Sequence, residues 1–155
     1  MNEKFDGCIR QNTFIKAPVE KVYDTIVSAD DWNTFFTTGM ELDPRPDGDI
    51  VFRWKDWGPD FYSLAAPGKV VTADRPNKFA FQWGSPEGGG PSVITFNLEA
   101  AHGGTVIRLT EEGYSDTKQG RAMILECASG WGEALTLLKF YIEHGIVYTP
   151  PEKNA

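Results

Sequence analysis

Two glycines flank a tryptophan, as Gly130-Trp131-Gly132, inside the longest amphipathic segment of the chain. This segment runs from about Asp116 to Gly145, and its apolar residues recur every three or four positions, which predicts a helix. Each glycine in a helix interior costs about 1 kcal/mol relative to alanine. We therefore expect a compensating structural reason. Either the indole of Trp131 needs space, or a strand packs close to the helix backbone.

Before this helix, the hydrophobic pattern alternates with a period of two, which is typical of β-strands. A first strand is predicted over residues 8–16, followed by two short helices, and further strands follow from residue 50 to 112. Residues 61–72 are expected to form one strand that is broken at Pro67-Gly68. Short turns join the strands and favour antiparallel pairing. The chain is thus predicted to be α+β, with a curved antiparallel sheet wrapped around the long C-terminal helix and two short helices after the first strand.

A curved sheet cannot follow a helix at close-packing distance along its whole length, so this pattern favours a cavity between them. Large apolar side chains from several segments are expected to converge on Trp131, although each of them alone also fits an ordinary hydrophobic core. The predicted cavity residues are Trp32, Phe36, Phe52, Trp54, Phe81, Trp83, Phe96, Leu109, Glu111, Trp131 and Leu135.

Glu111 is the only candidate for catalysis. Strand alternation places it on the same face as Ile107 and Leu109, which is expected to look inward. A carboxyl group on an apolar wall is costly to ionise, which suits a general acid or base, or a polar contact for a ligand. Its partner would be Tyr62 or Tyr114. The alternative is that the strand ends early and leaves Glu111 solvated at the rim.

Composition excludes several function classes. The net charge of −7 makes nucleic-acid binding improbable, because phosphate backbones repel such a chain. No apolar run is long enough to span a membrane, and the N-terminus has no signal-peptide pattern, so we expect a cytoplasmic protein. The two histidines and two cysteines form no metal-binding spacing, and no cofactor is expected. Cys127 is interpreted as a small buried apolar residue.

Four local patterns follow one another along the chain. They are Ala17-Pro18-Val19-Glu20-Lys21-Val22-Tyr23; Gly68-Lys69-Val70 with Arg75-Pro76-Asn77-Lys78-Phe79 and Phe81-Gln82-Trp83; Gly103-Gly104-Thr105-Val106-Ile107 running to Gly113-Tyr114; and Gly130-Trp131 with Leu135, Leu138 and Gly145. In this order they resemble the START-like superfamily (SRPBCC, helix-grip fold), and within it the bacterial homologues of the heat-shock-protein 90 ATPase activator. The resemblance implies one such domain over residues 1–155, with a hydrophobic cavity between the sheet and the last helix. Proteins of this type often carry a histidine where this chain has Glu111.

Three functions are compatible with these features. The first is a small-molecule binding protein, not an enzyme, that holds a lipid-like or aromatic ligand in the cavity. The second is a cyclase- or hydrolase-type enzyme that uses Glu111 in the same cavity. The third is a co-regulator of a chaperone ATPase. The sequence leaves homodimer formation open.

Overall fold

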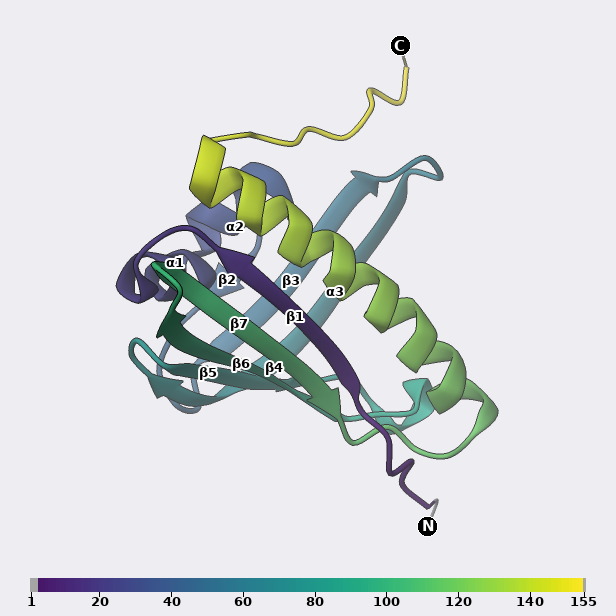
Figure 1. Cartoon of the computed structure of the whole chain (residues 1–155). Coiled ribbons are helices and arrows are strands. Elements are labelled where there is room, and N and C mark those ends of the chain that lie inside the picture. The colour runs from purple at the N-terminus through teal and green to yellow at the C-terminus, as the bar shows by residue number, and fades with distance from the viewer. Residues whose placement is uncertain (1–2, 155) are drawn as a thin grey trace.

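The computed structural model describes residues 3–154, so Met1, Asn2 and Ala155 of the predicted domain lie outside the described part. Seven strands form one antiparallel sheet in the order β1-β7-β6-β5-β4-β3-β2 (Figure 1). The strands are β1 (Ile9–Ile15), β2 (Glu41–Leu42), β3 (Asp49–Trp57), β4 (Tyr62–Asp74), β5 (Lys78–Trp83), β6 (Ser92–Ala101) and β7 (Gly104–Glu112).

Helices follow the first strand, the fifth strand and the last strand. The short helices α1 (Val19–Ile26) and α2 (Ala29–Phe35) come after β1, the 3-10 helix η1 (Pro86–Gly88) after β5, and the long helix α3 (Lys118–His144) after β7. The helix α3 is slightly shorter at both ends than the predicted segment, which runs from about Asp116 to Gly145. At its start, the hydroxyl of Thr117 accepts a hydrogen bond from the Gly120 N–H, and at its end Gly145 adopts a left-handed backbone with φ of 66°.

The helix α3 covers one face of the sheet (Figure 1). Its buried residues Trp131, Ala134, Leu135 and Leu138 pack into a core formed with the inward side chains of the strands. Along β6 and β7, buried and more exposed residues alternate. Every second side chain therefore points into the core, and those in between point away from it. The predicted α+β architecture is therefore confirmed.

The predicted break in the fourth strand is wrong, because β4 runs without interruption through Pro67 and Gly68. Proline lacks the N–H that a strand inside a sheet must donate to its neighbours. Pro67 pairs with Val51 of β3, and pairing with β5 starts only at Gly68, opposite Trp83. Pro67 therefore lies where β4 has a neighbour on one side only, and the strand tolerates it.

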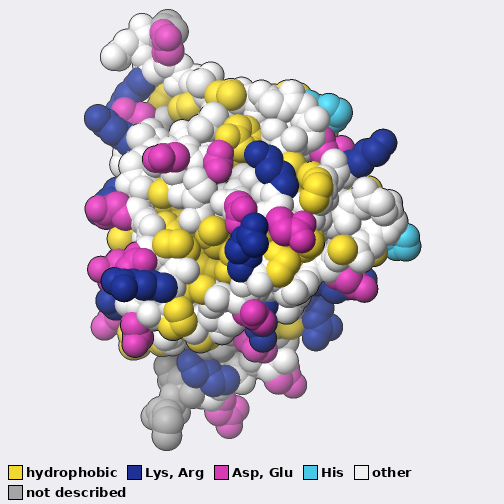
Figure 2. Space-filling model, turned by 90° about the vertical axis from the view of Figure 1, so that its left-hand side faces the viewer, with side chains coloured by type: hydrophobic (Ala, Val, Ile, Leu, Met, Phe, Trp, Pro, Cys, Tyr) yellow, Lys and Arg dark blue, Asp and Glu magenta, His cyan; other side chains and the backbone are white. Residues whose placement is uncertain are grey.

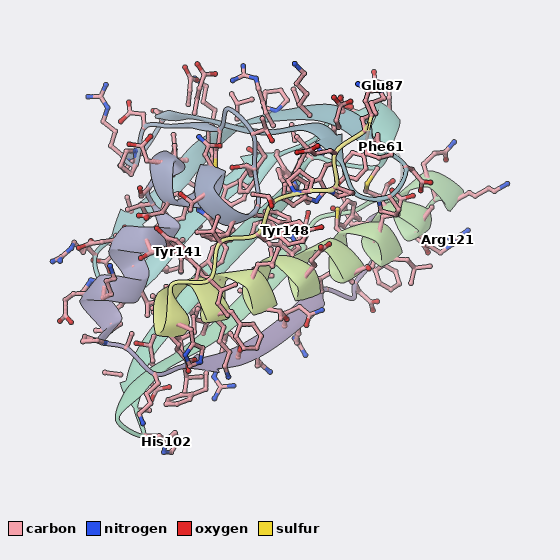
Figure 3. All side chains as sticks on the ribbon, turned by 90° about the horizontal axis from the view of Figure 1, so that it is seen from above. Phe61, Glu87, His102, Arg121, Tyr141 and Tyr148 are labelled. Atoms are coloured by element: carbon pink, nitrogen blue, oxygen red, sulfur yellow. The ribbon has the colours of Figure 1, made fainter. Side chains whose placement is uncertain are left out.

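The C-terminal end of α3 is fixed to α2. The hydroxyl of Tyr141 donates a hydrogen bond to Asp31 Oδ1 at 2.5 Å, and its ring lies 4.8 Å from that of Phe35, centroid to centroid. Beyond α3, the chain runs towards the turn between β3 and β4, and Tyr148 packs on Trp57 at 5.3 Å between ring centroids (Figures 1 and 3). The final segment thus connects the helix to the far end of the sheet.

The surface carries both signs of charge. On the face shown in Figure 2, acidic and basic side chains are interspersed around apolar side chains near its centre. Such a distribution presents no continuous basic area on this face for a polyanion. Within residues 3–154, no helix combines the length and the apolarity that a membrane crossing requires.

Candidate functional site

A cavity of about 840 Å³ lies between the sheet and α3. Its inner wall is formed by buried aromatic side chains, and its mouth by exposed residues of β4 and α3 and by the loop that follows β5. Binding sites for small molecules typically occupy about 300–1,000 Å³ and combine an apolar lining with few polar groups. This cavity has that size and that lining.

The cavity exists because β4 is much longer than its neighbour β5. The two strands pair from Gly68 to Asp74, so the first residues of β4, Tyr62 to Pro67, have no partner on the β5 side. Leu64, Ala65 and Ala66 from this free part line the cavity. The space that a longer β5 would fill is left open between β4 and α3.

The loop after β5 closes one side of this space and is fixed to the start of α3. Gly84, Ser85 and Gly90 of the loop line the cavity. The Ser115 N–H donates a hydrogen bond to the Gly89 carbonyl oxygen at 2.8 Å, and a Cβ atom on Gly89 would lie 2.5 Å from the Gly120 backbone. Only glycine allows this close approach, which holds the loop against the helix.

The helix contributes a second face besides the one that packs in the core. Met123, Glu126, Cys127, Gly130 and Glu133 line the cavity, at the spacing of three or four residues that one helix face requires. A Cβ atom at Gly130 would have no neighbouring atom within 4 Å. The proposal that a strand packs close to the helix glycines is therefore wrong at Gly130, which borders the open cavity.

The second glycine of the motif, Gly132, does not line the cavity. A Cβ atom there would lie 3.7 Å from the side-chain nitrogen of Gln11, which is an ordinary van der Waals distance. Gln11 of β1 donates a hydrogen bond to the Ala128 carbonyl oxygen at 3.0 Å, so the contact between helix and strand here is made by a side chain. No strand backbone approaches Gly132 either.

The carboxylate of Glu111 accepts hydrogen bonds from four side chains. Its Oε2 accepts from Trp83 Nε1 at 2.9 Å, from the Ser92 hydroxyl at 2.5 Å and from the Tyr114 hydroxyl at 2.5 Å. Its Oε1 accepts from Trp131 Nε1 at 2.8 Å. Glu111 has no exposed surface (0%), so the alternative of a solvated glutamate at the rim is wrong. The donors line the cavity, whereas Glu111 lies behind them.

The position of Glu111 changes what its carboxylate can do. Four donors occupy the two oxygens, so a molecule in the cavity would meet Trp83, Ser92, Tyr114 and Trp131 before it met the carboxylate. The primary effect of this arrangement is to fix the orientation of its donors. Of the two expected partners, Tyr114 makes the contact, and Tyr62 lies instead at the mouth.

The two indoles held by Glu111 stack on each other. The rings of Trp83 and Trp131 lie 5.6 Å apart between centroids with an interplanar angle of 27°, and Phe52 packs edge-on against Trp131 at 6.0 Å. The third indole of the wall, Trp54, differs because its buried Nε1 has no hydrogen-bond partner. A buried N–H without a partner costs about 1–3 kcal/mol.

The structure brings five of the predicted cavity residues to the cavity wall, and these are Phe36, Phe52, Trp54, Trp83 and Trp131. The other six lie in the buried core around it, and these are Trp32, Phe81, Phe96, Leu109, Glu111 and Leu135. The other lining residues, from β4, from the loop and from the second helix face, were not among the predicted cavity residues. The spacing of Met123, Cys127 and Gly130 places them on one helix face, but the sequence does not distinguish this face from a solvated one.

Cys127 lines the cavity next to Tyr114, with 3.1 Å between its Sγ and the tyrosine oxygen. The Tyr114 hydroxyl has one proton and donates it to the stronger acceptor, the carboxylate of Glu111. Burial raises the pKa of the Cys127 thiol to about 11, and the charge of Glu111 adds to this effect. Burial and the same charge also raise the pKa of Tyr114. Both groups therefore stay protonated at neutral pH.

This raised pKa predicts slow chemistry at Cys127. With a pKa of about 11, about one Cys127 in a thousand is a thiolate at pH 8, whereas an ordinary thiol is partly ionised there. Iodoacetamide should therefore label Cys127 at least about tenfold more slowly in the folded protein than in urea, as measured by peptide mass spectrometry. Equal labelling rates at Cys127 with and without urea would contradict this assignment.

No group of three or more histidine, cysteine or acidic side chains among residues 3–154 is arranged to hold a metal ion. Cys8 and Cys127 are free thiols.

The sequence profile of the family described as activator of Hsp90 ATPase homolog 1-like protein matches residues 16–143. The chain belongs to this family. The matched region runs from the end of β1 into the last turn of α3 and contains every residue that lines the cavity. The domain is a START-like helix-grip domain, as the sequence resemblance implied.

Solved structures of other proteins share the fold of this family member. One is the solution structure of the Aha1 dimer from Colwellia psychrerythraea, with 24% identity, a TM-score of 0.74, and coverage of 90% of this chain and 98% of that one. Another is the crystal structure of protein SSP2350 from Staphylococcus saprophyticus, with 22% identity, a TM-score of 0.73, and coverage of 94% and 98%. No curated protein sequence matches this chain.

Proposed function

We propose that this protein binds a small apolar or aromatic molecule in the cavity between the sheet and α3. One observation carries the proposal, namely that an open space of about 840 Å³ is walled by stacked indoles held in fixed orientation. Apolar side chains normally fill the space between a sheet and a helix, because a void loses dispersion contacts and burial. A ligand would supply those missing contacts.

The indoles at and near the cavity differ in their hydrogen-bond partners. Three other indoles have acceptors, since Trp83 and Trp131 donate to Glu111 and Trp32 donates to the Ile26 carbonyl oxygen at 2.7 Å. Trp54 lines the cavity but has no acceptor. Because this nitrogen is itself buried, the carbon atoms of the Trp54 ring form its part of the cavity wall.

The geometry favours binding over the two alternatives. Acid–base catalysis through Glu111 would require a substrate to displace one of four donors. Regulation of a chaperone ATPase rests on the family description alone. Two further expectations remain part of the proposal. The cytoplasm is the compartment that fits two free thiols, and the Colwellia protein, described as a dimer, is consistent with a homodimer.

A titration with the neutral fluorescent probe N-phenyl-1-naphthylamine tests the proposal. We expect saturable binding of one probe per chain and quenching of tryptophan emission, because the probe would lie against Trp83 and Trp131. Native mass spectrometry of freshly purified protein would show a retained ligand as added mass. Linear, unsaturable fluorescence together with the bare chain mass would overturn the proposal.

A further inference from the structure

The charged groups at the cavity are all acidic. Of the side chains that line it, Glu126 and Glu133 alone carry charge, and no lysine, arginine or histidine is present among the lining residues that the structure describes. Both glutamates are exposed on α3 and lie on either side of Gly130. They lie seven positions apart in the chain, which corresponds to about 10 Å along a helix. The two carboxylates therefore flank the mouth on the helix side.

Aromatic and apolar side chains face these carboxylates from the sheet. Tyr62 of β4 lies at the mouth with 46% of its surface exposed, and Leu64 lies beside it. Burial and the negative charge of Glu133 raise the pKa of the Tyr62 hydroxyl, so Glu133 on the helix is close to Tyr62 on the sheet. A ligand that enters passes between an acidic helix face and an aromatic strand face.

Deeper in the cavity, the charge is also negative. The Glu111 carboxylate behind the wall accepts hydrogen bonds from four neutral donors, and no cation among residues 3–154 is paired with it. The indoles of Trp83 and Trp131 line the cavity in front of it, and aromatic rings of this kind attract positive charge through the ring quadrupole. Aromatic rings with nearby carboxylates are the usual surroundings of bound ammonium groups. An anionic ligand would meet repulsion at each of these positions.

We propose that the cavity selects organic cations, in particular amines with an aromatic or apolar body. The ammonium group lies at the mouth between Glu126 and Glu133, and the body packs on Trp83 and Trp131. The inference rests on the proposed binding function and adds the class of ligand. Because the two carboxylates are exposed, salt weakens this selectivity.

Three ligands with the same ring system test the charge preference at neutral pH. These are 1-naphthylmethylamine, which is an ammonium ion, 1-naphthalenemethanol, which is neutral, and 1-naphthoate, which is an anion. Calorimetric titration at low salt should give the ammonium ion about tenfold higher affinity than the alcohol, with the carboxylate weakest. Equal affinity of the ammonium ion and the alcohol would overturn the inference and leave the proposed function intact. Binding of none of the three would overturn both.

A double variant separates the local carboxylates from the overall charge of the protein. The double change Glu126→Gln and Glu133→Gln should lower the affinity for the ammonium ion to that for the alcohol. The affinity for the alcohol itself should not change. The matched control is Glu99→Gln with Glu112→Gln, which changes net charge equally at exposed residues outside the cavity. If both double variants reduce ammonium binding to the same extent, the preference reflects net charge and the inference is wrong.

Discussion

Replacing Glu111 with alanine is expected to lower the free energy of unfolding by about 3–5 kcal/mol, the range found when one partner of a buried charged contact is removed. The change leaves the buried donors of Trp83, Ser92, Tyr114 and Trp131 without their acceptor. A donor that loses its acceptor in these largely apolar surroundings is costly. Urea unfolding monitored by far-ultraviolet circular dichroism measures the loss.

The neighbouring residue Glu112 is the control. It belongs to the same strand but is exposed, and Glu112→Ala should change stability by less than about 0.5 kcal/mol. The stability of the variant Glu111→Gln should lie between those of Glu111→Ala and Glu112→Ala. Its amide keeps one acceptor oxygen but directs N–H groups at some of the donors. If Glu111→Ala is as stable as Glu112→Ala, the four hydrogen bonds do not hold the wall together.

Replacing Gly130 with leucine is expected to abolish probe binding without destabilising the fold. The new side chain extends from the cavity-lining face of α3 into space where a Cβ atom meets nothing within 4 Å. It would occupy volume needed by a ligand, while leucine is a better helix former than glycine by close to 1 kcal/mol. We expect affinity for N-phenyl-1-naphthylamine to fall at least about tenfold and the urea midpoint to stay equal or rise.

The motif supplies a matched control for this variant. Gly132→Ala makes a comparable gain in helix propensity at a position outside the cavity, where the added Cβ meets only the side chain of Gln11. It should stabilise the protein by about 0.5–1 kcal/mol and leave probe binding unchanged. Gly130→Ala should stabilise equally but weaken binding. If Gly130→Leu binds the probe like the wild type, the ligand does not occupy this cavity.

The periodicity of apolar residues correctly predicted the elements that bury one face in the core. The apolar residues of α3 that contact the core, among them Trp131 and Leu138, follow the helical spacing, and their burial confirms it. The inward position of Glu111 also followed from strand alternation, because Ile107, Leu109 and Glu111 share one face of β7. Both predictions depend only on the residue spacing of a helix or a strand, which is set by the local backbone geometry.

The cavity wall was harder to predict because it depends on how strands of unequal length align. The overhang of β4 past β5 follows from the pairing of Gly68 with Trp83, which no local pattern reveals. The cavity face of α3 mixes Met123, Glu126 and Gly130, so its hydrophobicity does not distinguish it from a solvated face. Hydrogen bonds that join separate segments, as around Glu111, arise only when the tertiary structure is complete.

The Glu111 cluster also bears on how a binding protein of this shape acquires chemistry. Its carboxylate accepts three hydrogen bonds at Oε2 and one at Oε1, and it lies one side chain behind the wall of the cavity. Loss of the Ser92 hydroxyl would remove one of the three donors to Oε2 on the cavity side, while the two indoles kept the carboxylate in place. If the cavity binds a molecule as proposed, the step from carrier to acid–base catalyst in this scaffold is short, since a carboxylate already lies next to the cavity.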